Sequence, residues 1–356
     1  MSMQDLAYAH TEPELFASYK LKPEDFQVRE QLNFEPDGEG EHLFLLIEKK
    51  GLTTQDVQKI LMNFFRLADK DVSYSGMKDK QAITQQWFSV RPEAGTEAVL
   101  DKLNSEQLRI CRVQRNRRKL KRGSHVSNHF LIRLCDLNAD AHALEERLQL
   151  IADSGVPNYF GEQRFGKNAD NVLMAKQMFA GTTKFNDRYR RGIYLSAARA
   201  FLFNRVLSRR VQDGNWNTYI EGDVMSLDAS SASFRPAAWD EVLAERLLKN
   251  DIHPSGPLWG SGKLKSQGQC AELEQQVLAT ENALKEGLEQ SGLEQQRRAL
   301  RSVPGNFRFE IENSTTLTLE FTLNKGAYAT SLLRELVILR QDSDSSDSMR
   351  MAAASR

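Results

Sequence analysis

One short segment, residues 76–86, combines residue types that could carry out chemistry. Asp79 stands between Lys78 and Lys80, and neighbouring ammonium groups favour the charged form of a carboxylate. The two lysines would also attract a polyanion. Because Gly76 can adopt backbone angles that other residues resist, we expect a tight turn that presents Asp79. Taken alone, this local pattern is more typical of a charged turn between two strands.

A second candidate segment spans residues 112–122, which include seven basic residues and no acidic one. The whole chain carries 48 Lys+Arg and 48 Asp+Glu, so any phosphate-binding surface must come from local clustering rather than from net charge. A solvated basic loop is the alternative interpretation. The charge density favours phosphate binding, and the expected RNA contacts are Arg117, Arg118, Lys119 and Lys121.

Other classes of protein fit the sequence poorly. Three scattered cysteines form no disulfide framework, and His125 and His129 lack a third metal ligand beside them. No run of about 18 apolar residues predicts a membrane span, and the first residues lack the order of a signal peptide. Residues 257–264 suggest a phosphate loop, but Pro257 and Leu264 break its pattern. We therefore expect a cytoplasmic protein without a metal or nucleotide cofactor.

The elements that must position residues 76–86 predict an α+β domain. Thr53 or Thr54 can cap a helix, and Asn138 or Asp140 can open another that a Gly-Val-Pro sequence ends. Apolar alternation or short continuous apolar runs predict the strands, which are expected at 26–28, 42–47, 87–90, 108–113, 129–134 and 315–323.

The middle of the chain, residues 167–302, is expected to be mostly helical. The predicted helices lie at 195–207, at 240–248 and at 272–300, the last a long surface helix rich in Glu and Gln. The strand pattern returns afterwards, and another helix follows at 326–336. The middle is therefore expected to be an insertion that interrupts a domain completed by the C-terminal strand. We predict a discontinuous catalytic domain (1–156 and 303–340), an insertion domain (157–302) and a disordered tail (341–356).

Five motifs, in this order from about residue 20 to 336, resemble the TruD family of tRNA pseudouridine synthases. They are Phe26-x-Val28-x-Glu30, Gly76-x-Lys78-Asp79-x-x-Ala82-x-Thr84-x-Gln86, Asn158-Tyr159-Phe160-Gly161-x-Gln163-Arg164-Phe165-Gly166, Leu195-Ser196-Ala197-x-Arg199 and Tyr328-Ala329-Thr330-x-x-x-Arg334-Glu335. The resemblance implies a pseudouridine synthase catalytic fold, in which helices flank a mixed sheet, together with a largely helical α/β insertion domain.

The resemblance also implies a reaction. Bacterial members of the family isomerise uridine 13 in the D arm of tRNA, particularly tRNA-Glu. They break the C1′–N1 glycosidic bond, rotate the uracil and rejoin it through C5 without a metal, a cofactor or nucleotide hydrolysis. The implied partner is tRNA, and we expect a monomer.

The resemblance assigns roles to particular residues. Asp79 matches the catalytic aspartate, and Lys20 matches a lysine beside it. An ionised carboxylate can attack the sugar, attack the uracil or abstract a sugar proton, and the sequence leaves these open. Phe130 matches an aromatic that stacks on the target base, and Asn128 a nearby polar contact. The motifs also place Phe26, Glu30 and Lys78 in the substrate site and Arg164 among the RNA contacts.

Alternative interpretations remain at several levels. Phe130 could be a core residue and Lys20 a surface lysine. The family usually has a histidine where this chain has Asn116, and a glycine where it has Ser127. A non-catalytic tRNA-binding protein or RNA chaperone is the alternative function, and a glycosidase lacks a second convincing carboxylate.

Overall fold

The structure is a computed structural model that describes residues 5–93, 96–138, 140–166, 169–183 and 187–340. The chain forms two compact units, each with its own core. The sheet unit comprises Glu14–Leu144, Pro304–Lys325 and Val337–Arg356. The helix-rich unit comprises Met1–Pro13, Glu145–Val303 and Gly326–Leu336.

The sheet unit is built on a 10-stranded mixed sheet with the strand order β14-β15-β7-β2-β5-β3-β6. β1 pairs with β7 and β16, and β4 pairs with β5. The pairs β2–β5 and β1–β16 are parallel and the others are antiparallel. The strands are β1 (Phe16–Tyr19), β2 (Phe26–Leu32), β3 (His42–Lys50), β4 (Ser73–Tyr74), β5 (Ile83–Val90), β6 (Leu108–Asn116), β7 (His125–Cys135), β14 (Gly305–Asn313), β15 (Thr316–Asn324) and β16 (Ile338–Arg340).

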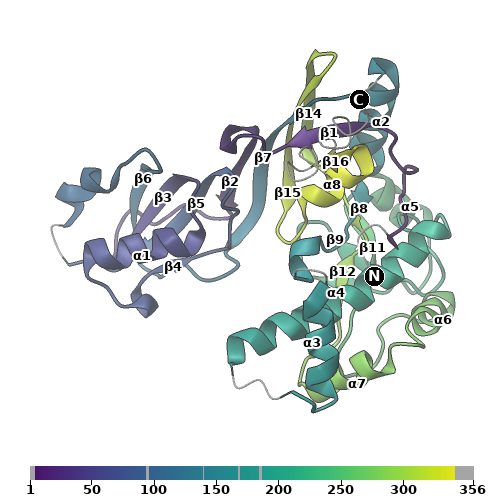
Figure 1. The fold of residues 1–356 in the computed structure, drawn as a ribbon. Coiled ribbons are helices and arrows are strands. Elements are labelled where there is room, and N and C mark those ends of the chain that lie inside the picture. Colours follow the sequence, from purple (N-terminus) through teal and green to yellow (C-terminus); the bar gives the residue numbers. More distant parts are fainter. Residues whose placement is uncertain (1–4, 94–95, 139, 167–168, 184–186, 341–356) are drawn as a thin grey trace, which may run out of the picture. The chain divides into compact units, whose positions relative to one another are not determined.

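Helix α1 (Thr54–Phe65) packs on this sheet, as the sequence predicted (Figure 1). Its N-cap is Thr53, whose hydroxyl accepts a hydrogen bond from the backbone N–H of Asp56. The Asp56 carboxylate accepts the backbone N–H of Thr53 in return, which completes a capping box. Val57 and Leu61 are fully buried among strand residues of β3 and β5. Their spacing of four residues is the one that places two side chains on one face of a helix.

The helix-rich unit is centred on the long helix α4 (Arg188–Gln212), whose apolar residues join the core of this unit (Figure 1). A four-stranded sheet has the order β10-β9-β11-β12, and β8 pairs with β13. The other helices are α3 (Asp170–Phe179), α5 (Glu241–Leu248), α6 (Gly268–Val277), α7 (Asn282–Gln290) and α8 (Ala329–Leu336); the strands are β8 (Val156–Pro157), β9 (Met225–Leu227), β10 (Ser233–Phe234), β11 (Ile252–Leu258), β12 (Gln296–Ala299) and β13 (Arg301–Ser302).

The prediction of one long helix over residues 272–300 is wrong. The segment contains the end of α6, the separate helix α7 and the strand β12. Gly292 adopts a φ of 73°, a left-handed conformation that glycine tolerates, just after α7 ends. β12 then pairs with β11, from Leu258 opposite Gln296 to Ser255 opposite Ala299. Tertiary strand pairing therefore overrides the helical propensity of a sequence rich in Glu and Gln.

Helix α2 (Ala141–Ser154) begins where Asp140 accepts hydrogen bonds from the backbone N–H groups of His142 and Ala143. It ends before Gly155, which has a φ of 72°. This cap resolves the choice between Asn138 and Asp140. Among the described helices, none combines the length and the apolar character that a membrane span requires.

The predicted domain boundaries stay a prediction. In the structure, residues 145–156 and 326–336 belong to the helix-rich unit, together with the middle of the chain. One cause is the pairing of Val156 and Pro157 in β8 with β13. The predicted tail, 341–356, lies outside the described residues.

Candidate active site

Asp79 lies in the loop that joins β4 to β5, and polar contacts hold this loop on the sheet unit. The Thr54 hydroxyl accepts the backbone N–H of Lys78 at 2.9 Å and donates to the side-chain oxygen of Gln86 at 2.8 Å. The Gln86 amide in turn donates to the carbonyl of Gly76 at 3.0 Å. Thr54 and Gln86 are fully buried, so these hydrogen bonds restrict the loop that carries Asp79.

Gly76 is not among the glycines with a positive φ. The expectation that it supplies an unusual backbone angle is therefore wrong. A Cβ at this position would lie 3.0 Å from Cε1 of His125, so the small size of glycine is what the site requires. Burial is the main cause that lowers the pKa of His125 to about 4, and the nearby charge of Lys78 adds to it. This ring is therefore neutral near pH 7.

The structure brings Lys20 and Asp79 together. Nζ of Lys20 lies 3.1 Å from Oδ2 of Asp79, and the two side chains are 14% and 33% exposed. The same ammonium lies 4.1 Å from the ring centroid of Phe26, within the range of a cation–π contact. Lys20 thus orients the Asp79 carboxylate, while a third of the Asp79 side chain stays exposed.

The lysines beside Asp79 in the sequence behave differently from the expectation. The Lys78 ammonium lies 2.8 Å from Oε2 of Glu30, and these side chains are 7% and 0% exposed. Glu30 also accepts the backbone N–H of Trp87 at 3.2 Å. Lys80 is exposed. The predicted site residues Lys78 and Glu30 therefore form a buried ion pair, and Lys20 is the lysine that contacts the Asp79 carboxylate.

Lys49 is a residue that the sequence reasoning missed. It is fully buried, and its ammonium donates hydrogen bonds to the carbonyls of Leu52 at 2.6 Å and Asp79 at 2.8 Å. Burial lowers the pKa of Lys49 to about 8, against an opposing influence of the Asp79 carboxylate. One signal was available: Lys49 is in phase with Leu45 and Ile47 in a strand, and these point to the core.

Strand register places the predicted substrate-binding residues on one face of the sheet. Asn128 in β7 lies opposite Glu30 in β2 and opposite Leu323 in β15. Phe130 lies two residues further along β7, opposite Val28 in β2. Residues opposite each other, and residues two apart in one strand, share a face.

Phe130 is only 7% exposed. Its ring stacks on Phe321 with centroids 5.3 Å apart, and the edge of Phe26 packs against it at 6.2 Å. Nearby, the side-chain oxygen of Asn128 is buried and has no hydrogen-bond partner within the described residues. Phe130 is thus a packed core aromatic that contacts Phe26, the ring on which the Lys20 ammonium lies. Its predicted role in base stacking stays a prediction.

The predicted basic segment, residues 112–122, covers the end of β6 and most of the connection to β7. All four predicted RNA contacts, Arg117, Arg118, Lys119 and Lys121, are exposed. Arg117 also forms an ion pair with Glu39, and Lys119 donates to the carbonyl of Lys70. Between Lys119 and Lys121, Leu120 is buried against aromatic residues and anchors the segment. The positive charge is therefore displayed on a fixed part of the sheet unit.

The two departures from the family pattern have local structural roles. The Asn116 side chain accepts the backbone N–H of Asp37 at 3.0 Å and donates to the carbonyl of Arg118 at 2.6 Å. The Ser127 hydroxyl donates to Gln31 at 2.6 Å. Both residues are buried, and each side chain thus finds a hydrogen-bond partner within the sheet unit.

Arg164 belongs to the helix-rich unit. Its guanidinium donates to the hydroxyls of Ser196 at 2.9 Å and Tyr328 at 2.8 Å. The structure therefore connects three of the motifs that carry the family resemblance, because these residues come from 158–166, 195–199 and 328–335.

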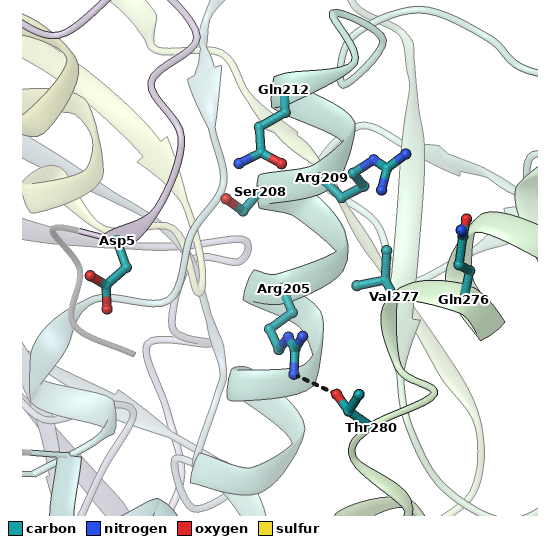
Figure 2. A pocket seen from close by; sticks show the side chains of 8 residues that line it. All are labelled: Asp5, Arg205, Ser208, Arg209, Gln212, Gln276, Val277 and Thr280. Carbon is teal, nitrogen blue, oxygen red and sulfur yellow. Dashed lines mark hydrogen bonds between the residues drawn. The ribbon is translucent and has the colours of Figure 1, made fainter.

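A cavity of about 360 Å³ lies elsewhere in the helix-rich unit, along α4 (Figure 2). Arg205 and Arg209 line it, and Arg205 donates a hydrogen bond to Thr280 at 3.3 Å. Both arginines already pair with carboxylates, Arg205 with Glu281 at 2.5 Å and Arg209 with Asp213 at 2.8 Å. The cavity contains none of the predicted site residues.

Comparison with known proteins identifies relatives that cover almost the whole chain. The family model described as tRNA pseudouridine synthase D (TruD) matches residues 3–184 and 179–336. The tRNA pseudouridine synthase D of Xanthomonas axonopodis pv. citri is 43% identical, with 93% of this chain and 94% of that protein covered. The Aeromonas hydrophila protein of the same name is 42% identical, with 94% of each covered.

A solved TruD structure from Methanosarcina mazei shares the fold, with a TM-score of 0.71 and 21% identity over 93% of this chain and 95% of that one. The α+β fold predicted from the sequence is confirmed, and so is the resemblance carried by its five motifs. This chain belongs to the TruD family of tRNA pseudouridine synthases.

Proposed function

We propose that this protein isomerises uridine to pseudouridine in tRNA, with Asp79 as the catalytic carboxylate. The proposed target is uridine 13 in the D arm, particularly of tRNA-Glu, by resemblance to the bacterial members of the family. Family membership supports the reaction class. The observation that carries the role of Asp79 is its 3.1 Å contact with Lys20, in a loop restrained by buried hydrogen bonds.

The reaction conserves every atom of the nucleotide. The C1′–N1 bond breaks, the uracil rotates, and a C1′–C5 bond forms. C5 loses its proton and N1 ends with one, so no oxidant, reductant or hydrolysis is required. An ionised Asp79 could act as a nucleophile toward the sugar or the uracil, or as a base toward a sugar proton. In each case Lys20 would orient the carboxylate and stabilise its charge.

The proposed base site adjoins this pair. A uridine in folded tRNA must leave its stack to be reached, and contact with an aromatic surface offsets part of that cost. Phe130 would provide such a contact, and its ring packs against Phe26, which in turn contacts Lys20. Unsatisfied buried polar atoms are rare in folded proteins, so we propose that the Asn128 amide acquires a partner when RNA binds. Glu30 and Lys78 would support the site through their buried ion pair.

The remaining proposals concern partners and conditions. Arg117, Arg118, Lys119 and Lys121 would contact tRNA phosphates, as would Arg164. We expect the protein to act as a monomer in the cytoplasm, and the proposed isomerisation requires no metal or cofactor. A non-catalytic tRNA-binding protein or RNA chaperone is the alternative function.

Release of tritium from C5 separates the two functions. The purified protein is incubated with tRNA-Glu that carries tritium at uracil C5. Because rejoining through C5 displaces the label, an isomerase releases tritium to water, whereas a binding protein does not. A tRNA with cytidine at position 13 is the matched control for the target. Release from the normal tRNA but not from this control is the expected result.

Two outcomes would contradict the proposal. An absence of release from normal tRNA under conditions of saturating binding would favour the binding protein. Equal release from the two tRNAs would leave the isomerase intact and refute uridine 13 as the target. Mapping of pseudouridine along the tRNA product then identifies the position that is modified.

A further inference from the structure

Two arginines of the helix-rich unit share one aromatic ring. The guanidinium carbon of Arg298 lies 4.1 Å from the ring centroid of Phe160, and that of Arg164 lies 5.6 Å from the same centroid. Phe160 is 9% exposed and is packed in the core of this unit. A buried ring with two cation–π contacts holds both guanidinium groups in place. The two positive charges are therefore close together and pre-oriented.

Neutral groups supply the remaining contacts of both arginines. Arg164 donates to the hydroxyls of Ser196 and Tyr328. Nη2 of Arg298 donates to the side-chain oxygen of Asn158 at 2.5 Å and to the carbonyl of Gly326 at 2.9 Å. Its Nε donates weakly to the Asn158 carbonyl at 3.4 Å.

Each guanidinium keeps an unused donor. Within the described residues, Nε of Arg164 and Nη1 of Arg298 have no hydrogen-bond acceptor. Both arginines are partly exposed residues. A guanidinium presents its donors in a planar fork that matches the oxygens of a phosphate. Two such donors beside one ring are groups that could donate hydrogen bonds to a phosphate.

No carboxylate of the described chain balances this charge. Burial is the main cause that lowers the pKa of Arg298 to about 10; Tyr328 opposes this shift and the positive charge of Arg164 adds to it. By contrast, Arg205 and Arg209 of the cavity in Figure 2 each pair with a carboxylate. The fully buried Arg210 likewise pairs with Asp223 at 2.8 Å. The Arg164–Arg298 pair thus lacks the anion that these arginines have.

We propose that Arg164 and Arg298 form a phosphate site that binds one backbone phosphodiester of the RNA substrate. The identity of the ligand as tRNA rests on the proposed function, whereas the affinity for a phosphodiester rests on the arginine pair. Such a contact positions the RNA without reading its sequence. The site assigns a role to the aromatic and glycine-rich segment 158–166, which carries Asn158, Phe160 and Arg164.

The test measures tRNA affinity as a function of salt concentration. Loss of one phosphate contact reduces the slope of log K against log salt by about 0.7–0.9. Arg164→Gln should show this reduction, whereas Arg298→Lys, which keeps the charge, should keep the slope and bind several-fold more weakly. Arg209→Gln is the matched control, because this arginine already pairs with Asp213, and it should retain the slope. A wild-type slope in a folded Arg164→Gln variant would overturn the proposal.

A second measurement requires no variant. Phenylglyoxal modifies accessible arginines, and mass spectrometry reports the rate at each position. Bound tRNA should slow the modification of Arg164 and Arg298 but not that of Arg209. Equal rates at Arg164 and Arg298 with and without tRNA would overturn the phosphate site. Neither measurement depends on turnover, so tritium release from C5 tests the proposed isomerase separately.

Discussion

Nζ of Lys20 lies 3.1 Å from Oδ2 of Asp79, although 59 positions separate the two residues in the chain. The sheet explains how they meet. Lys20 directly follows β1, which pairs with β7, and β7 pairs with β2. β2 lies next to β5, the strand that follows the Asp79 loop. Lys20 itself has a φ of 57°, a left-handed conformation that is uncommon for lysine. Uncommon backbone conformations cluster at functional sites.

Replacement of Asp79 tests the proposed chemistry. Asp79→Ala and Asp79→Asn should abolish tritium release, because neither side chain provides an ionised carboxylate. The affinity for tRNA should stay within a few-fold of the wild type, since phosphate contacts supply most of the binding energy. Single-turnover release and filter binding measure the two effects. Appreciable product from either variant would refute the assignment of Asp79.

The buried pair Lys78–Glu30 should show strong coupling in a double-mutant cycle. Removal of one partner leaves an uncompensated buried charge, so Lys78→Met should lower the free energy of unfolding by about 3–5 kcal/mol. Glu30→Gln should also be destabilising. The double variant should recover much of the stability, because neither charge remains buried. Urea unfolding measures all four proteins, and additive effects would show that the pair does not interact as the structure indicates.

Lys49 should make stability depend on pH in the alkaline range. Its pKa is about 8 in the folded protein, whereas a lysine without such burial has a pKa of 10.5, so between these values the unfolded chain binds more protons. The free energy of unfolding should therefore rise with pH across this window because of Lys49, by up to about 3 kcal/mol. Below pH 8 the lysine is charged in both states, and the cost of its burial is fully present.

The Lys49→Met variant provides the comparison. The groups whose charges act on Lys49 are Asp79, Lys78 and Asp56, and all three are retained in the variant. Urea unfolding at several pH values from 7.5 to 10.5 should show a smaller rise for the variant than for the wild type. If the two rises are the same, Lys49 does not titrate in this range.

The basic segment between β6 and β7 should contribute unequally to RNA binding. Arg117, Arg118 and Lys121 are all exposed, but Arg117 already pairs with Glu39. Arg118→Gln and Lys121→Gln should each reduce the salt dependence of tRNA binding by about one phosphate contact. Arg117→Gln should have a smaller effect. An unchanged slope in the Arg118→Gln/Lys121→Gln double variant would show that the segment points away from the RNA.

Local interactions made part of this protein predictable. The capping box of Thr53 and Asp56 lies within four consecutive residues, so the start of α1 could be read directly. Strands β3 and β7 could also be predicted, because each contains a short apolar run of consecutive residues. The five motifs, with the one around Asp79 among them, identified the family, because their residue types, spacing and order are specific in combination.

Only the tertiary structure decided which charges meet. Neighbours in the sequence suggested Lys78 as a partner of Asp79, yet the loop between β4 and β5 places the Lys78 ammonium against the buried Glu30. Lys49 in β3 is buried and donates to the carbonyl of Asp79, and strand pairing makes residues 296–299 the strand β12 instead of the expected helix. Ion pairing and burial depend on contacts between residues far apart in the chain, and a periodicity within one segment carries no information about the partner across the sheet.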